Sequence, residues 1–204
     1  MSKIGIIGGT FNPIHNGHIL LALYCKEQIG LDKVIFIPTY TPPHKISDDL
    51  ASETDRLNMC RIAVKKYSDF YVSDIEIKRK GKSYTYETLS ELKTVYKDDT
   101  LYFVVGADMF LTLDKWKNPD IIFKNAFIAA VPRNSADFAQ LSDYYDRVLK
   151  PLGAKAVILD EPVLTVSSTF IRRNIDFDKN IEPLIDEDVY EYIKQNDLYK
   201  ECRG

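Results

Sequence analysis

Two glycines and two histidines stand close together after the first apolar run of the chain. Gly8 and Gly9 end that run, and His15 and His18 stand at the start of an apolar segment that begins near Ile19. Glycines let backbone amides approach an anion closely, and a helix start presents unpaired N–H groups and a partial positive charge. Histidines three residues apart share one helix face, so both imidazoles can point toward the same anion. This spacing predicts a phosphate-binding site.

The segment from Gly8 to His18 fits neither common phosphate-binding pattern. It lacks the G-x-G-x-x-G of dinucleotide-binding folds, and after Gly17 it carries His-Ile where a P-loop has Lys followed by Ser or Thr. Two alternatives stay open at this point. The glycines could form a tight turn beside ordinary loop histidines, or the histidines could bind zinc, although no nearby Cys or carboxylate is spaced to supply a third ligand.

A second candidate phosphate site lies near the other end of the chain. Ser167, Ser168 and Thr169 are residue types that cap helix N-termini, and Arg172 follows them. A capped helix start beside an arginine can bind an anion. Taken alone, the segment is more typical of an ordinary capped surface helix.

Short apolar runs bounded by turn residues recur along the chain and predict strands that are buried on both faces. They are Ile4–Ile7, Val34–Ile37, Phe70–Val72, Leu101–Val105, Ala126–Val131 and Ala156–Leu159. Helical periods lie between and after these runs, at Ile19–Cys25, Leu57-Cys60-Val64, Leu89-Leu92-Tyr96 and Asp186–Asn196. Alternating strands and helices form parallel βαβ units with helices on both sheet faces. The sequence therefore predicts a Rossmann-like α/β fold with a parallel sheet, as one domain over residues 1–204.

Ligands in such a fold bind beyond the carboxyl ends of the strands. The loop after Ile7 lies at that edge, and so do Gly106 and Asp108, which follow the fourth predicted strand. Pro42–Pro43 and the polar run Ser47–Thr54 predict a mobile loop.

The composition excludes several classes of protein. The chain has 204 residues, of which 45% are hydrophobic and 28% charged, so it is neither disordered nor fibrous. With 27 basic and 30 acidic residues, the formal charge is −3, and no basic excess indicates nucleic acid or an anionic membrane as a partner. No apolar segment approaches the roughly 18 residues of a membrane span, and Gly8 interrupts the first run too early for a signal peptide. Small ligands are the expected partners.

The cysteines indicate the compartment. Cys25, Cys60 and Cys202 are odd in number and far apart, without a C-x-x-C pair. They therefore predict neither a disulfide framework nor a zinc ribbon. We expect a reducing, cytoplasmic setting.

Taken together, the two candidate phosphate sites resemble a known superfamily. Gly9–His18 resembles the (G/T)-x-F-x-P-x-H-x-G-H signature of the nucleotidyltransferases. Val166–Arg172 resembles their I-S-S-T-x-I-R signature, with Val in place of the first Ile. Because both signatures occur in the expected order, nucleotide binding is favoured over a plain turn, a zinc site or an ordinary surface helix.

Three further segments are similar to the bacterial nicotinate-nucleotide adenylyltransferases. The P-P-H-K, S-Y-T-x-x-T and G-A-D-M…W patterns of that family are matched by Pro42–Lys45, Ser83–Thr88, and Gly106–Met109 with Trp116. The resemblance runs from Lys3 to about Tyr199. The smaller pantetheine-phosphate adenylyltransferases share the first signature, but they are shorter and lack the Gly106–Trp116 pattern.

The resemblance implies a role for each motif residue. The residues implied to hold ATP are Gly8, Gly9, Thr10, Phe11, His15, His18, Gly106, Ser168, Thr169 and Arg172. Those implied to hold the pyridine nucleotide are Asn12, Lys45, Thr85, Asp108, Trp116 and Arg133. His15 and His18 are the implied catalytic residues, because they stand where charge develops in the reaction.

The implied reaction is adenylyl transfer from ATP to the 5′-phosphate of nicotinate mononucleotide, which forms deamido-NAD and pyrophosphate in NAD biosynthesis. The attacking phosphate is already anionic, so the protein aligns the reactants and stabilises charge without a general base. Mg²⁺ is expected with ATP, bound mainly by phosphate oxygens and few protein ligands. A different acceptor, such as nicotinamide mononucleotide or phosphopantetheine, and a nucleotide-binding regulator without turnover are the alternatives.

Some of these residues keep a second interpretation. Trp116 could be a packing anchor, Lys45 a solvated loop charge and Asp108 a helix cap. Lys117 could attract a ring carboxylate or face solvent. A homo-oligomer also stays open.

Overall fold

The fold is taken from a computed structural model of the chain. It describes residues 1–42, 49–160, 166–175, 181 and 183–200. Lys45, which we predicted at the pyridine nucleotide, lies outside the described residues, as do Ser47 and Asp48 of the predicted loop.

Six parallel strands form one sheet in the order β3-β2-β1-β4-β5-β6. The strands are β1 (Lys3–Gly9), β2 (Lys33–Pro38), β3 (Phe70–Val72), β4 (Thr100–Gly106), β5 (Phe127–Val131) and β6 (Ala156–Ile158). All six predicted strands are thereby confirmed. The strand order reverses at β1, whose neighbours are β2 and β4, so the loop after β1 lies at the topological switch point of the sheet.

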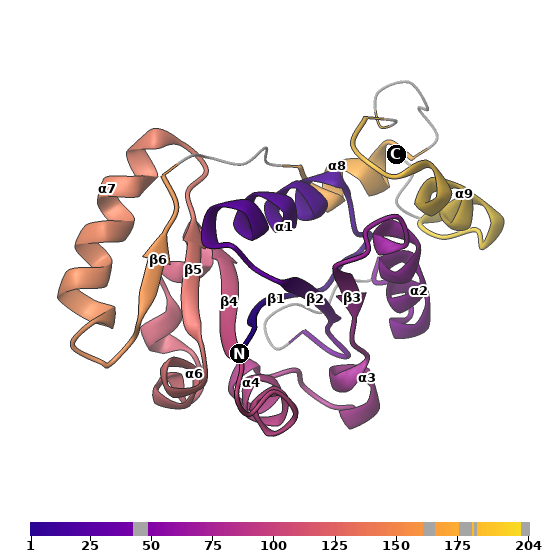
Figure 1. Cartoon of the computed structure of the whole chain (residues 1–204). Helices are drawn as coiled ribbons and strands as arrows, with labels where there is room; N and C mark the ends of the chain where they lie inside the picture. The colour runs from indigo at the N-terminus through magenta and orange to yellow at the C-terminus, as the bar shows by residue number, and fades with distance from the viewer. Residues whose placement is uncertain (43–48, 161–165, 176–180, 182, 201–204) are drawn as a thin grey trace.

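Helices cover both faces of the sheet, which confirms the predicted Rossmann-like α/β fold (Figure 1). The described α-helices are α1 (Asn16–Ile29), α2 (Glu53–Val64), α3 (Ile75–Arg79), α4 (Thr85–Val95), α5 (Ala107–Phe110), α6 (Pro119–Asn125), α7 (Ser135–Tyr144), α8 (Ser168–Arg173) and α9 (Glu187–Gln195). A 3-10 turn, η1 (Leu113–Lys115), and a π turn, η2 (Tyr145–Leu149), complete the helical segments.

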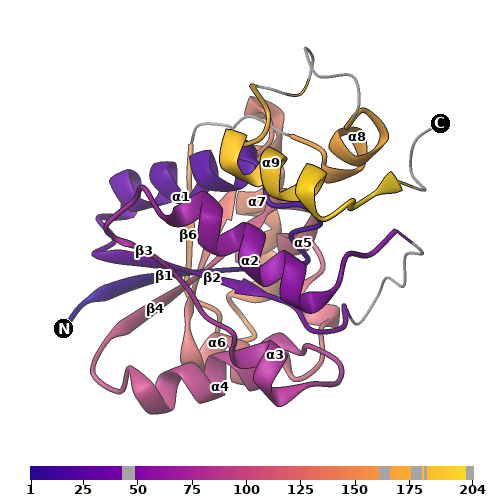
Figure 2. The ribbon, with the colours of Figure 1, turned by 90° about the vertical axis from the view of Figure 1, so that its right-hand side faces the viewer.

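Successive strand side chains enter two separate hydrophobic cores. In β1, Ile4 and Ile6 pack into the core under α4 and α6, whereas Ile7 packs into the core under α1, α2 and α9. Because strand side chains alternate between faces, both layers of helices can bury the same continuous apolar run. Figure 2 shows α2 and α9 side by side on one of these layers.

Helix ends follow local capping residues. α1 stops where Gly30 adopts a left-handed φ of 69°. At its other end α1 begins at Asn16, before the predicted start at Ile19, because the extended His15 serves as its N-cap. α2 begins at Glu53, where the Ser52 hydroxyl accepts a hydrogen bond from the Asp55 amide at 3.1 Å.

The predicted mobile loop is therefore shorter than Ser47–Thr54, because its last two residues belong to α2. Within the described residues, no helix has the length and apolar character to cross a membrane.

Candidate active site

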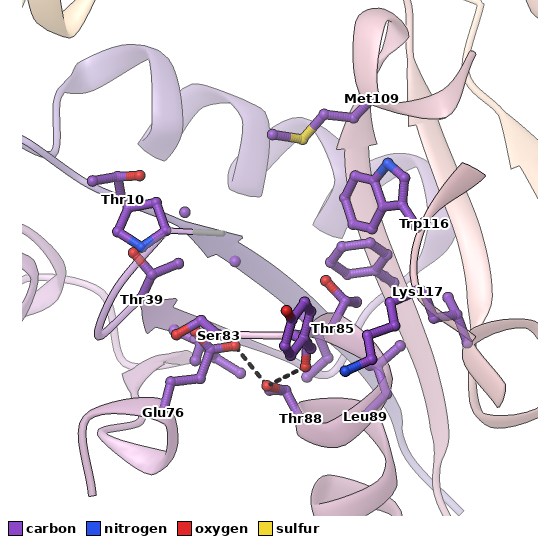
Figure 3. Close-up of a pocket in the computed structure, with 18 of the residues that line it drawn as sticks. Thr10, Thr39, Glu76, Ser83, Thr85, Thr88, Leu89, Met109, Trp116 and Lys117 are labelled. Carbon is purple, nitrogen blue, oxygen red and sulfur yellow. Dashed lines mark hydrogen bonds between the residues drawn. The ribbon is translucent and has the colours of Figure 1, made fainter. Parts of the chain in front are cut away.

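A pocket of about 300 Å³ opens at the carboxyl edge of the sheet, between the loop after β1 and the segment that follows α5. It brings together five residues that the sequence analysis placed at the nucleotides: Gly8, Gly9, Thr10, Thr85 and Trp116. Figure 3 shows Thr10 and Thr39 on one side of the pocket and Trp116, Lys117 and Thr85 on the other. Residues from opposite halves of the chain thus form one site.

Trp116 stands on the pocket wall with a fixed orientation. Its indole Nε1 donates to the Thr112 hydroxyl at 3.2 Å, and its ring meets the Phe103 ring edge-on at 6.1 Å. The ring is half-buried and lines the pocket, so one surface remains available to a flat ligand.

Lys117 also lines the pocket. Its Nζ lies 4.1 Å from the centre of the Tyr84 ring, within the range of a cation–π contact. This position favours the interpretation that Lys117 faces a ligand over the one that it only faces solvent.

The two histidines of the first motif stack on each other. Their ring centroids are 3.7 Å apart, and the edge of the Phe11 ring lies 5.0 Å from His18. The backbone N–H of His15 donates to Nδ1 of His18 at 3.2 Å. Because Nδ1 accepts this bond, a neutral His18 carries its proton on Nε2 and presents an N–H donor there.

Burial lowers the pKa of both imidazoles. The pKa of His15 falls from 6.5 to about 4. The pKa of His18 lies well below its usual value, first through burial and then through the nearby His15. Both rings are neutral at pH 7, so toward an anion they can act as hydrogen-bond donors but not as cations.

We expect these histidines to make the protein less stable in mild acid. The unfolded chain binds a proton at His15 below pH 6.5, whereas the folded protein binds it only near pH 4. Stability is therefore lost as the pH falls through this window, by about 2 kcal/mol for His15 between pH 7 and 5, with a further loss in the same direction from His18. Urea unfolding at both pH values measures the loss.

A His15→Asn variant provides the control for this pH effect, because Asn is a favourable N-cap and does not titrate in this range. Its free energy of unfolding should depend less on pH than that of the wild type. Equal pH dependence in the two proteins would contradict the lowered pKa of His15.

The second motif packs directly on the first. The Ser167 side chain caps α8 by accepting from the Phe170 amide at 3.3 Å, and the Ser168 hydroxyl donates to the Pro13 carbonyl at 3.0 Å. The Arg172 guanidinium is buried and donates to the Asn12 carbonyl at 2.8 Å. The structure thus joins the two sequence motifs at one place.

The Arg172 side chain also contacts the loop that contains Asp49. Its second terminal nitrogen pairs with Asp49 at 3.0 Å and lies 3.5 Å from the Thr169 hydroxyl. Its Nε is buried and has no hydrogen-bond partner among the described residues. A buried donor without a partner costs free energy, so this nitrogen is the one part of the guanidinium that the described contacts leave unsatisfied.

The Asn12 side chain is used inside the protein. Its Nδ2 donates to the Asp49 carbonyl at 2.9 Å, and its Oδ1 accepts from the Ala51 amide at 3.0 Å and the Tyr199 hydroxyl at 2.8 Å. The residue does not line the pocket. We predicted Asn12 at the pyridine nucleotide. Its side chain joins two loops in this structure, and a contact with the nucleotide stays a prediction.

Comparisons with known proteins give the family of the chain. The sequence model of the cytidylyltransferase-like family matches residues 6–174. A probable nicotinate-nucleotide adenylyltransferase of Clostridium tetani (strain Massachusetts / E88) is 38% identical, over 98% of this chain and 100% of the relative. The chain belongs to the nicotinate-nucleotide adenylyltransferase family. A second family member, from Exiguobacterium sibiricum, is 40% identical over 97% of this chain and 98% of its own length.

Solved structures confirm the fold of this adenylyltransferase family member. The nicotinic acid mononucleotide adenylyltransferase of Plasmodium falciparum, solved with NaAD, superposes with a TM-score of 0.77 at 19% identity and covers 98% of both chains. A putative nicotinate-nucleotide adenylyltransferase from Vibrio parahaemolyticus gives a TM-score of 0.68 at 22% identity, over 98% of this chain and 97% of its own.

Arg133 and Asp108 form an ion pair with each other and do not line the pocket. We had predicted both residues at the pyridine nucleotide. Arg133, which follows β5, binds Asp108 in α5 at 2.9 Å and Asp137 at 3.2 Å. Gly106 is the N-cap of α5, which places Asp108 in the first turn of that helix. Both charged groups are exposed at the carboxyl edge of the sheet, where a ligand could separate them.

The sequence analysis missed three buried charged residues, which are Arg56, Glu76 and Asp137. Glu76 lines the pocket, and its Oε1 accepts from the Thr88 hydroxyl at 2.6 Å. Burial raises the pKa of this carboxyl group. A signal for Arg56 was present, since it stands four residues before the buried Cys60 and so on the same face of α2.

Proposed function

We infer that this protein transfers the adenylyl group of ATP to the 5′-phosphate of nicotinate mononucleotide, with deamido-NAD and pyrophosphate as products. The observation that carries the inference is the meeting of both motifs beside a pocket that Trp116 and Thr85 line. Relatives at 38% and 40% identity over nearly the whole chain bear this enzyme's name. Buried free thiols at Cys25 and Cys60 are in keeping with a reducing, cytoplasmic setting.

The geometry supports a role for each part of the site. The loop Gly9–Phe11 would bind the ATP phosphates through backbone amides, and the Nε2–H of His18 would donate to charge that develops around the α-phosphate. The pyridine ring would lie against Trp116. The mononucleotide phosphate then attacks the α-phosphorus in line, the bond to the β,γ-pyrophosphate breaks, and pyrophosphate leaves.

We expect Mg²⁺ to bind together with ATP. The described residues contain no group of three or more His, Cys, Asp or Glu side chains placed to hold a metal. An ion that is bound mainly by the phosphate oxygens of ATP needs few protein ligands. It would neutralise negative charge on the triphosphate.

Removal of divalent cations should leave the nucleotide-free protein as stable as before. An ion that arrives with ATP contributes nothing to the fold in its absence, whereas a structural metal contributes directly to folding. Thermal unfolding with and without a chelator is the measurement, and turnover in the same buffers should depend on added Mg²⁺. A large drop in the thermal midpoint after chelation would instead indicate a structural zinc.

Pyrophosphate release from ATP tests the proposed function. Nicotinate mononucleotide, nicotinamide mononucleotide and phosphopantetheine are offered separately as acceptors, and deamido-NAD is identified as the product of the first. Release with phosphopantetheine alone would assign the other adenylyltransferase activity. ATP binding without turnover on any acceptor would identify a nucleotide-binding regulator.

A further inference from the structure

Arg56 of α2 is completely enclosed by the protein. Its side chain is 1% exposed and is the largest among the fully buried ones. Among the described residues, no carboxylate lies close enough to form an ion pair with it, and Glu53 and Glu76 act on it only from a distance. Burial lowers its pKa, yet arginine remains protonated at neutral pH. A buried cation of this kind is costly unless other groups compensate it.

Among the described residues, the hydrogen bonds that compensate this charge come from three backbone carbonyl groups. Nη1 donates to the Thr10 carbonyl at 2.8 Å, Nη2 to the Tyr40 carbonyl at 3.0 Å and Nε to the Ala51 carbonyl at 3.1 Å. Thr10 follows β1, Tyr40 follows β2, and Ala51 precedes α2. One planar side chain thus joins the loop after β1 to both ends of the connection between β2 and α2.

These bonds fix the direction of the amides that follow Gly9. The Gly9 carbonyl accepts from the Thr39 amide at 3.0 Å, and the Thr10 carbonyl accepts from Arg56. Because a trans peptide is planar, the next N–H in each case points the opposite way. Within the part of the chain that the structure describes, neither the Thr10 nor the Phe11 N–H donates to another residue. Both donors are thus without a partner among the described residues, and Thr10 lines the pocket.

The backbone between the two clamped carbonyls is strained. Phe11 has a φ of 48°, in the left-handed region that non-glycine residues rarely adopt. Such a conformation persists only where the surrounding structure fixes it. Arg56 holds the carbonyl before Phe11, and Arg172 holds the carbonyl of Asn12 after it. A cation on a carbonyl also polarises the same peptide group, which makes its N–H a stronger donor.

We propose that Arg56 is a positioning residue for ATP: it holds the Thr10 carbonyl so that the Thr10 and Phe11 amides face the triphosphate. It touches no substrate and acts through the loop. This role rests on the proposed adenylyl transfer and adds to it a residue that no sequence motif contains.

The substitution Arg56→Lys tests the role. Lysine keeps the positive charge but cannot reach three carbonyls in one plane. We expect kcat/KM for ATP to fall roughly 10- to 100-fold, while KM for the pyridine mononucleotide changes less than about threefold. The matched control is Val64→Ala, which truncates a buried side chain at the far end of the same helix. If the control loses as much activity at a comparable thermal midpoint, Arg56 is only structural.

A titration of the wild-type protein keeps the test independent of folding defects. Addition of inorganic tripolyphosphate, followed by amide NMR, should shift the Thr10 and Phe11 resonances. Unchanged resonances for both amides at saturating tripolyphosphate would overturn the proposal. The titration needs no turnover, so a wild-type protein that binds tripolyphosphate in this way but makes no dinucleotide would contradict the proposed function alone.

Discussion

Nicotinate mononucleotide should be used with a kcat/KM roughly 10² to 10⁴ times that of nicotinamide mononucleotide, because hydrogen bonds to a charged group are worth about 1.5–3 kcal/mol each and two donors are available. These donors are the backbone amides of Thr85, at the start of α4, and of Lys117. Neither donates to another described residue. A carboxamide would turn its own N–H toward one of them.

The position of Lys117 supports the same preference. Its ammonium lies at the Tyr84 ring on the pocket wall, where it would attract a ring carboxylate. Lys117→Met should reduce the preference by less than about tenfold, since an exposed charge contributes little. Lys124→Met on the exposed side of α6 is the control.

The measurement compares kcat/KM for the two mononucleotides at fixed ATP and Mg²⁺. Equal values would identify an enzyme of dual specificity. A preference for the amide would show that the two backbone donors do not recognise the ring carboxylate.

His18→Ala should reduce kcat by roughly 10² to 10³ while the protein stays folded, the usual loss when one preorganised donor to developing charge is removed. The half-buried ring stacks on His15 and accepts one backbone hydrogen bond, so its removal should cost the fold little. Steady-state turnover and a thermal melt are measured on the same sample.

Two further variants separate the catalytic donor from the helix cap. The oxygen of His18→Asn can replace Nδ1 as acceptor for the His15 amide, but no donor remains at the position of Nε2. The amide of His18→Gln can place an N–H near that position. We expect Gln to retain more activity than Asn, and near-wild-type turnover with Asn would show that Nε2 is not the catalytic donor.

The strands could be predicted from the sequence because each is an uninterrupted apolar run. Val34–Ile37 and Leu101–Val105 are buried on both faces, and such runs leave little doubt about their environment. The start of α1 was placed too late because its N-cap is His15, which is not a common capping residue. The usual capping signal was therefore absent from the sequence at the true start of α1.

Hydrogen bonds between different loops could not be predicted in the same way. Arg56 belongs to a residue type that is almost always exposed, and its burial depends on carbonyls at Thr10, Tyr40 and Ala51 that the fold brings together. The family resemblance places Asn12 at the pyridine nucleotide, and it could not predict that the Asn12 side chain also binds two other loops. Spacing along one segment contains no information about such partners.

The hydrogen bond from Tyr199 to Asn12 has a consequence for the order in which the protein matures during synthesis. All six strands precede residue 159, so the sheet can assemble while later residues are still being added. The loop that follows β1 receives its tie from Tyr199 only after α9 has been made. The strands on either side of this loop are therefore synthesised well before the residue that holds its Asn12 side chain.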